Sequence, residues 1–455
     1  MAFSNDQYEW CETEPMVWTR SVDEVELFYA ALAEQWRGTG RMFFAMTGHI
    51  SITVDAPVDW CSDMESAVDI ALQHAWLALR FDHPTIGARV VRDSRLGGGF
   101  TKTYHTLIDA IDQRAWLDQT LVKISTGQTG AEWANSDPPA PVYPTLFVVS
   151  PPAVAPSPGS ARKRIRRDLV IRSPHDIMDG IGTLMLLNNL PPYRIAAGVP
   201  PTPTTAQTAR LQALAEEKRS AALGVELLTV PLSSTEVVPG KHQRVAITLP
   251  VQETARILAK GRELGATVTH IFHAAIPMAM RDIQDPAAEA RRVRYVNYIL
   301  RNERPSCVYP YSTDLHPASV YHSVSGGSLM VDLTVPRADS AGSSADEQVE
   351  EYGRIVSKMK DFYFGVKTDA EHAHIAPSSG LGPIDPIIVP SKGPFEMHDP
   401  WVTGEELGTG LGVFLGTYRD RLTLSAAYND AFHDEAKVQD FLERCKDIVY
   451  RGLGI

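Results

Sequence analysis

The sequence predicts a mixed α/β protein of two similar lobes, for three reasons. Its 455 residues exceed the roughly 250 to 300 at which one hydrophobic core stops growing. Helix-like and strand-like segments interleave in both halves of the chain, which is typical of α/β layers. Five prolines within residues 191–205 mark a boundary between the halves. We therefore expect an N-terminal lobe over 1–200, a crossover segment over 201–240 and a C-terminal lobe over 241–455.

The elements of the first half follow from apolar periodicity and from residues that begin or end helices. Ser21, followed three residues later by Glu24, forms a capping-box pattern that predicts a helix start. An apolar period near 3.6 predicts a second helix, which stops before Pro84. The predicted helices span 21–40, 63–84 and 180–190, and the predicted strands span 42–57, 143–151 and 166–174.

The last two of these strands flank a segment rich in proline and serine. We expect a long surface hairpin there, with a domain linker as the alternative. The basic run over 161–168 is expected to be a solvated edge in the hairpin loop, and the glycine-rich run over 95–102 a surface turn.

The second half repeats this mixture, although no internal repeat can be read from it. A helix near 205–222 is expected to cross between the lobes. Thr267 or Thr269 is expected to cap a buried apolar helix. The predicted helices span 251–265, 267–283, 345–366 and 434–449, and the predicted strands span 243–250, 292–301, 326–336 and 421–429.

Composition and charge argue against several classes of protein. Hydrophobic residues make up 44% and charged residues 22% of the chain, as in ordinary globular proteins. The formal net charge of -12 argues against a nucleic-acid partner, because phosphate backbones attract basic surfaces. A polar, acidic N-terminus and the lack of a long apolar window predict a cytoplasmic protein without a membrane segment. The four cysteines form no C-x-x-C pair and are expected to be buried free thiols.

A histidine, an aspartate and a glycine lie between the strand over 166–174 and the helix over 180–190. His175 begins this connection, and Asp179 and Gly180 supply turn chemistry, because glycine tolerates positive φ and aspartate bonds its local backbone. An imidazole exchanges protons near neutral pH, so His175 is a candidate general base. From this spacing alone, a locally satisfied histidine remains the alternative.

Other groups of reactive residues point less clearly to a site. His270 and His273 lie one turn apart in an apolar helix, where core packing is the default. His372 and His374 have a strand-like spacing for two metal ligands, with no further ligand beyond Glu371, so no metal site is expected. The chain contains neither the phosphate-binding loop G-x-x-x-x-G-K-[ST] nor the nucleophile elbow G-x-S-x-G.

The run H-D-I-M-D-G over 175–180 resembles the H-x-x-x-D-G signature of the CoA-dependent acyltransferase superfamily. That superfamily includes chloramphenicol acetyltransferase, the plant BAHD acyltransferases, nonribosomal peptide condensation domains and fungal trichothecene 15-O-acetyltransferase-like proteins. Segments 74–90 and 415–445 are similar to the family's first-lobe helix and to its closing strand and helix, so the resemblance covers most of the chain. The BAHD motif D-F-G-W-G is absent, which favours the fungal branch.

The resemblance implies an α/β fold of two chloramphenicol-acetyltransferase-like lobes, with a tunnel between them and His175 at its middle. His175 would act as the general base, and Gly180 would allow the turn. Asp179 would be structural and would pair with an arginine that follows a strand of the second lobe. Arg301 is the favoured partner and Arg304 the substitute.

The resemblance also implies the reaction, which is the transfer of an acyl group from acyl-CoA, a co-substrate, to a hydroxyl or an amine of a secondary metabolite. Ser378 or Ser379 would line the tunnel or stabilise the developing oxyanion. No bound cofactor is expected. A monomer is expected, because one chain with two lobes can enclose its own site, although the sequence leaves the oligomeric state open.

Three alternatives remain open. The acyl donor could be an acyl carrier protein, or the same fold could perform a non-acylating reaction such as that of a cyclase or pericyclase. The third alternative is a binding protein with a relic histidine. The sequence also leaves open the acyl chain, the acceptor, and the choice between oxygen and nitrogen as nucleophile.

Overall fold

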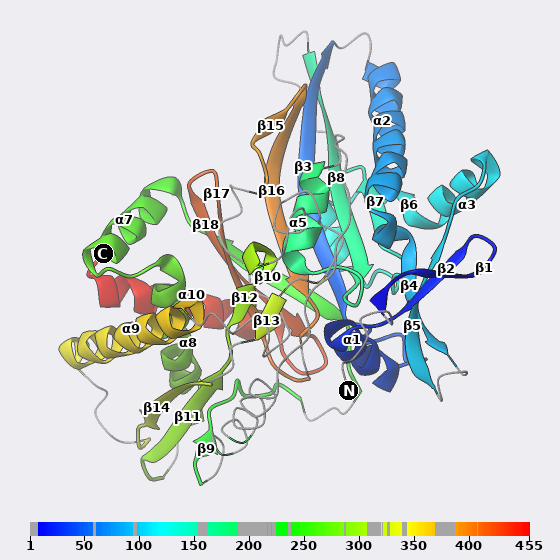
Figure 1. Cartoon of the computed structure of the whole chain (residues 1–455). Coiled ribbons are helices and arrows are strands. Elements are labelled where there is room, and N and C mark those ends of the chain that lie inside the picture. The colour runs from blue at the N-terminus through cyan, green and yellow to red at the C-terminus, as the bar shows by residue number, and fades with distance from the viewer. Residues whose placement is uncertain are drawn as a thin grey trace. The chain divides into compact units, whose positions relative to one another are not determined.

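The computed structural model describes residues 8–57, 61–93, 98–152, 162–189, 216, 220, 224–234, 238–285, 288–306, 320, 322–324, 328–338, 344–368, 387–406 and 408–455 (Figure 1). The chain divides into two compact units. The first unit comprises Met1–Thr202, Arg304–Tyr321 and Pro383–Glu405, and the second comprises Pro203–Glu303, His322–Gly382 and Glu406–Ile455.

The two units differ from the expected lobes, since the segment 241–455 is divided between them. Strand β16 (Phe395–Gly404) explains part of this difference, because it pairs with β3 (Ala45–Pro57) in a sheet of the first unit. A pairing between strands so far apart in the sequence leaves no local pattern from which it could be predicted.

The first unit consists of two sheets with helices packed on them (Figure 1). Its strands are β1 (Cys11–Glu14), β2 (Val17–Ser21), β3, β4 (Ala88–Asp93), β5 (Gly99–His105), β6 (Leu121–Ile124), β7 (Thr145–Val149), β8 (Arg162–Pro174), β15 (Ser391–Lys392) and β16. Its helices are α1 (Glu24–Gln35), α2 (Cys61–Asp82), α3 (Ala110–Thr120), α4 (Gly130–Ala134), α5 (Gly180–Asn189) and the 3₁₀ turns η3 (Pro84–Gly87) and η5 (Arg304–Ser306).

The larger sheet of this unit fixes where β8 ends. Its strand order is β15-β16-β3-β8-β7-β6, and the smaller sheet has the order β1-β2-β5-β4. Strands β3 and β8 run antiparallel along their whole length, from Pro57 opposite Arg162 to Ala45 opposite Pro174. The residue that follows Pro174 is therefore held at the edge where β3 begins.

Helix α5 packs directly on this sheet. At Gly48 of β3, a Cβ atom would lie 2.3 Å from Cγ2 of Thr183, a residue of α5. No side chain fits at such a distance, so the glycine is what allows the helix to approach the strand. The buried Leu184 and Leu187 of α5 add apolar contact area to this packing.

The second unit is also mixed α and β. Its strands are β9 (Glu226–Leu227), β10 (His242–Thr248), β11 (Arg291–Asn297), β12 (Leu300–Asn302), β13 (His322–Val324), β14 (Leu329–Val335), β17 (Gly412–Tyr418) and β18 (Arg421–Asn429). They form sheets of order β10-β18-β17, β14-β11-β9 and β12-β13. Its helices are α7 (Val251–Glu263), α8 (Val268–Asp282), α9 (Ala345–Thr368) and α10 (Glu435–Leu453), and apolar side chains of all four belong to one buried cluster.

Most elements predicted from periodicity are confirmed, and four local predictions are wrong. The glycine-rich run over 95–102 contributes Gly99–Lys102 to β5 instead of forming a surface turn. The N-cap of α1 is Asp23, with Glu26 completing the capping box, instead of Ser21 with Glu24. The strand predicted over 292–301 divides into β11 and β12. The basic run lies within β8 instead of a loop, and its Arg167 is buried beside Asp69.

Two further expectations can be compared with the described residues. Cys445 is buried, as expected, whereas Cys11 is exposed. No helix in the described part of the chain combines the length and the hydrophobicity that a membrane crossing requires.

Candidate active site

The connection between β8 and α5 holds His175 by its backbone. The His175 amide donates a hydrogen bond to the carbonyl oxygen of Phe44 at 3.1 Å, and the Ile177 amide donates to Pro174 at 3.1 Å. The first bond continues the β3–β8 ladder by one residue, and the second closes a tight turn directly after the strand. His175 is 7% exposed, and these two backbone hydrogen bonds fix its position at the end of the sheet.

Asp179 caps the N-terminus of helix α5. Its Oδ1 accepts a hydrogen bond from the Gly182 amide at 2.7 Å, and its carbonyl oxygen accepts from the amide and hydroxyl of Thr183. These are the contacts of an N-cap residue, which satisfies amides that the first helical turn leaves without partners. Gly180 is the first residue of the helix, and its φ is not positive, so the expectation that Gly180 serves a positive-φ turn is wrong.

Arg304 pairs with Asp179 in a bidentate ion pair. Its Nη1 and Nη2 lie 2.9 and 3.0 Å from the two carboxylate oxygens, and both side chains are almost fully buried. The favoured candidate Arg301 does not take this place. It lies in β12, with its guanidinium near the Glu303 carboxylate at 3.4 Å and donating to the Val366 carbonyl at 3.2 Å. Arg304, in the turn that follows the strand, is the residue that reaches Asp179.

The ring of Tyr29 stacks on the imidazole of His175. The two ring centroids are 3.7 Å apart and the planes differ by 13°. Tyr29 belongs to α1 and is itself buried. One face of the imidazole is therefore covered by an aromatic ring from a different element.

A buried cluster of charges joins α1 to the residue after His175. Lys102 of β5 lies 2.5 Å from the Glu26 carboxylate and donates to the Asp176 carbonyl oxygen at 3.2 Å. Arg20 also binds Glu26, through two hydrogen bonds of 2.6 and 2.8 Å. Burial alone would raise the pKa of Glu26, but Lys102 and Arg20 lower it to about 2. Glu26 therefore stays ionised at neutral pH and holds both cations.

Two other carboxyl groups near this cluster shift in the opposite direction. Burial raises the pKa of Asp176 to about 7, against the influence of Lys102. Burial and the charge of Glu26 raise the pKa of Asp23 to about 6. The charge cluster that reaches the residue after His175 thus contains acids that hold their protons more tightly than usual.

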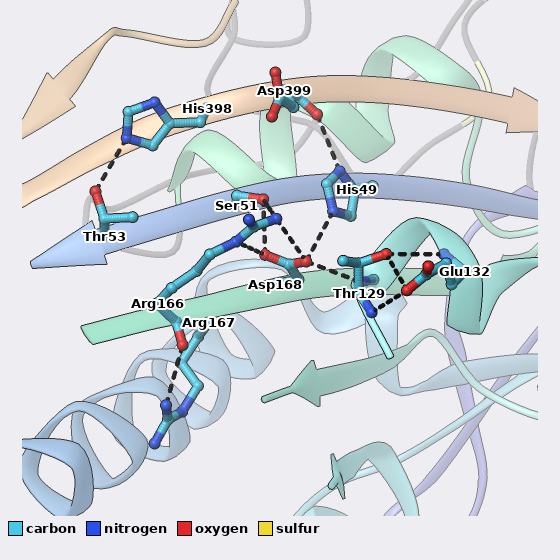
Figure 2. Close-up of polar contacts among 11 residues, drawn as sticks. His49, Ser51, Thr53, Thr129, Glu132, Arg166, Arg167, Asp168, His398 and Asp399 are labelled. Carbon is cyan, nitrogen blue, oxygen red and sulfur yellow. Dashed lines mark hydrogen bonds and ion pairs between the residues drawn. The ribbon is translucent and has the colours of Figure 1, made fainter. Parts of the chain in front are cut away.

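A second buried polar network lies on the same strands, around Asp168 of β8. Asp168 accepts hydrogen bonds from the Ser51 hydroxyl, the Arg166 guanidinium and the Gly130 amide, and His49 Nε2 lies 3.9 Å away (Figure 2). The Ser51 hydroxyl donates to the carboxylate and not to His49, so this is not a serine–histidine–aspartate relay. The network cross-links β3, β8 and α4.

The remaining sequence candidates separate into two groups. His273 contacts the hydroxyls of Tyr295 and Tyr363 at 2.9 and 3.1 Å, and burial lowers its pKa to about 4, as a neutral core histidine requires. His270 completes the capping box of α8 with Thr267. The other candidates, Ser378, Ser379, His372 and His374, lie outside the described residues. Within the residues that the structure describes, no cluster of three or more metal-ligating side chains is found.

Sequence reasoning missed the residues around His175 that come from distant elements. Tyr29, Glu26 and Lys102 lie far from His175 in the sequence and belong to a helix and a strand of other layers. The sequence around these three residues contains no motif that predicts a contact with the turn that bears His175. Lys102 in particular belongs to a run that was predicted to be a surface turn, yet its side chain is buried.

The arrangement suits proton transfer by an imidazole held in one orientation. A histidine fixed by its backbone and by a stacked ring can accept a proton from a hydroxyl or amine and return it later. The charge of Asp179 is paired with the Arg304 guanidinium, which binds both of its carboxylate oxygens.

Two known proteins are distantly similar in sequence, one along almost the whole chain and one along about a quarter of it. No family model matches the chain. The acetyltransferase pigO of Monascus ruber is 21% identical, over 98% of both chains. The acyl-CoA-dependent acyltransferase MAC1 of Pseudozyma antarctica is 26% identical over 28% of this chain and 23% of its own length.

Two solved structures also resemble the chain along almost its whole length. The trichothecene 15-O-acetyltransferase TRI3 of Fusarium sporotrichioides superposes with a TM-score of 0.72 at 15% identity, covering 99% of both chains. The first condensation domain of the CDA synthetase has a TM-score of 0.55 at 13% identity, covering 96% of both chains. The chain therefore has the two-lobed fold shared by CoA-dependent acyltransferases and condensation domains.

Proposed function

We propose that the protein is an acyltransferase of secondary metabolism, with acyl-CoA as donor, a small-molecule hydroxyl or amine as acceptor, and His175 as the general base. The fold supports this proposal, and so do relatives named as an acetyltransferase, an acyl-CoA-dependent acyltransferase and a 15-O-acetyltransferase. The tunnel between the lobes that the resemblance implies stays a prediction.

One observation of the site carries the proposal. The connection that bears His175 is fixed on both sides, by the Phe44 carbonyl before it and by the buried Asp179–Arg304 pair after it. A loop fixed at both ends holds the residue that bears the imidazole in place. Such pre-organisation is what a catalytic base needs and what a surface histidine lacks.

The proposed step balances with the groups that acyl transfer supplies. His175 accepts the proton of the acceptor hydroxyl or amine while that atom attacks the thioester carbonyl. The carbon–sulfur bond then breaks, and the imidazolium returns the proton to the CoA thiolate. No covalent acyl-enzyme is involved, since the acceptor itself is the nucleophile.

The test is an assay of purified protein with acetyl-CoA and a panel of hydroxylated and amino terpenoids and polyketides, followed by thiol release and product mass. His175→Ala should lower the rate by about 10² to 10⁴-fold in folded protein. A product that has gained the acyl mass supports the proposal. Wild-type turnover by His175→Ala would overturn the role of the histidine.

Two outcomes of the same assay would support the alternatives. If only an acyl-loaded carrier domain serves as donor, acyl-CoA is not the co-substrate. If the acceptor is converted without change of mass, the reaction is a rearrangement and not an acyl transfer.

A further inference from the structure

The stacking of Tyr29 on His175 limits the rotation of the imidazole, which a general base needs to keep in one orientation. Once the backbone of a histidine is fixed, its side-chain torsions decide where the ring nitrogens point. The torsion χ2, about the Cβ–Cγ bond, sets the plane of the ring and is intrinsically broad. A ring lying 3.7 Å away and only 13° from parallel leaves no space for the imidazole to turn about that axis. Tyr29 thus determines the plane of the imidazole.

Tyr29 can do this only if α1 is itself held against the turn that bears His175. Glu26 and Tyr29 are three residues apart in α1, so they lie on the same face of the helix. Glu26 binds Lys102, and Lys102 also donates to the carbonyl oxygen of Asp176. One ammonium group therefore ties the face of α1 that carries Tyr29 to the residue that follows His175.

The ion pair between Lys102 and Glu26 is shielded from solvent. The exposed fractions of Lys102 and Glu26 are 1% and 4%, so water does not compete for the bond. Glu26 also anchors the start of α1, because it accepts from the Asp23 amide in the capping box at 3.1 Å. The start of the helix, the ion pair and the turn after β8 form one connected set of contacts.

We propose that Tyr29 and Lys102 are positioning residues for His175, Tyr29 by fixing the plane of the imidazole and Lys102 by tying α1 to the turn. This inference rests on the proposed role of His175 as the base. It assigns no contact with substrate to either residue.

The first experiment replaces the stacking ring. Tyr29→Leu should lower kcat by about 10 to 10²-fold with little change in KM, because misplacement of a base affects the chemical step more than binding. Tyr29→Phe keeps the aromatic ring and should retain activity close to that of the wild type. Equal losses in both variants would overturn the stacking role.

A spectroscopic measurement tests the same contact without any assay of acyl transfer. An aromatic ring stacked on the imidazole shifts its carbon-bound proton resonances upfield. In protein with ¹³C-labelled histidine, the resonances assigned by their loss in His175→Ala should show this shift in the wild type and in Tyr29→Phe. They should lose it in Tyr29→Leu, and an unchanged spectrum in that variant would overturn the inference even if acyl transfer is confirmed.

The second experiment removes the Lys102 ammonium, which links Glu26 to the Asp176 carbonyl. Lys102→Met deletes the ammonium but leaves Glu26 paired with Arg20, so the Glu26 carboxylate keeps a cation. We expect a lower kcat and a reduced ring shift of His175. Lys123→Met removes an exposed lysine of β6 that pairs with Asp69, and should change neither. If Lys102→Met keeps the wild-type upfield shift of the His175 ring protons and the wild-type kcat, Lys102 is not a positioning residue.

Loss of a buried side chain also lowers stability, so a matched control is needed. Tyr352 of the second unit is 1% exposed, and its hydroxyl donates to the Ile271 carbonyl. Tyr352→Leu should lower the melting temperature as Tyr29→Leu does, but keep wild-type kcat per folded molecule. If both variants lose activity in proportion to stability, Tyr29 has only a structural role. If His175→Ala stays active while the ring shift follows the predictions, the proposed function fails and the stacking geometry stands.

Discussion

The guanidinium of Arg304 and the carboxylate of Asp179 form two parallel hydrogen bonds of 2.9 and 3.0 Å inside the first unit. Asp179 also caps α5, so this ion pair attaches a turn from late in the chain to the helix that follows His175. A bidentate pair fixes orientation as well as distance. The pair therefore fixes the far end of the connection that carries the histidine.

Removal of the Arg304 guanidinium should destabilise the protein strongly. Arg304→Met leaves the Asp179 carboxylate buried without its cation, which costs about 3 to 5 kcal/mol in comparable sites. Urea unfolding at pH 7 measures this loss. The double variant Asp179→Asn with Arg304→Met should recover part of it, because asparagine still caps the helix and carries no charge.

Arg114 provides the control for that prediction. Its guanidinium pairs with Asp118 at 2.9 Å and both side chains are exposed, so Arg114→Met should change the unfolding free energy by about 1 kcal/mol or less. If both single variants unfold at the urea concentration of the wild type, the buried pair does not stabilise the connection.

Asp176 should make the protein less stable as the pH rises. Burial raises its pKa from 3.8 to about 7, Lys102 acts against this and Glu26 adds to it. A carboxyl whose pKa is higher in the folded state binds its proton more tightly there. Its stabilising contribution is therefore complete below about pH 4 and is lost as the pH rises through 7.

Asp176→Asn tests this direction. The amide cannot ionise, so the variant should be more stable than the wild type at pH 8, on the order of 1 kcal/mol or more, and should show no such gain at pH 4. Unfolding in urea at pH 4, 6 and 8 gives the comparison. Asp440→Asn, at an exposed pair with Arg444, serves as control, and a gain that does not depend on pH would contradict the prediction.

Gly130 should not tolerate a side chain. A Cβ atom there would lie 2.7 Å from His49 Cδ2 and 2.8 Å from Asp168 Cβ, and Figure 2 shows how closely these two side chains approach. Gly130→Ala should therefore lower the unfolding free energy by about 1 to 3 kcal/mol. Gly353→Ala, in α9 with nothing within 4 Å of the added atom, should raise it by about 0.5 to 1 kcal/mol. Equal effects of the two substitutions would mean that the network around Asp168 is loosely packed.

The sequence predicted best the elements whose signals are local. The strand over 421–429 agrees with β18 to the residue, and Thr267 caps α8 as one of the two predicted threonines. Both depend on alternation or on a cap within a few residues. The connection between β8 and α5 was likewise placed correctly, because a strand pattern and a helix pattern meet there.

The cap of α1 shows where local signals become ambiguous. The run S-V-D-E-V-E offers two capping boxes of the same spacing, Ser21 with Glu24 and Asp23 with Glu26. Lys102 and Arg20 bind Glu26, and so favour the second box through contacts that lie outside the local sequence. The same reason explains why Tyr29 and Lys102 could not be found around His175, and why Arg304 could not be separated from Arg301.

Acid should weaken the link between α1 and the turn after β8. Lys102 and Arg20 hold the pKa of Glu26 at about 2, below its ordinary value of 4.5 and against the effect of burial. A carboxyl whose pKa is lower in the folded state stabilises the protein above its unfolded pKa. This contribution is lost as the pH falls from about 4.5 towards 2.

Glu26→Gln should remove that pH dependence. At pH 6 the variant should be less stable than the wild type by on the order of 3 kcal/mol, and the difference should shrink as the pH is lowered towards 2. Glu263→Gln, which removes an exposed carboxylate paired with Lys260, should have little effect at pH 6. A difference between wild type and Glu26→Gln that stays constant from pH 6 to pH 2 would show that Glu26 acts through packing alone. In that case its ion pair with Lys102 would not be what holds α1 against the turn that bears His175.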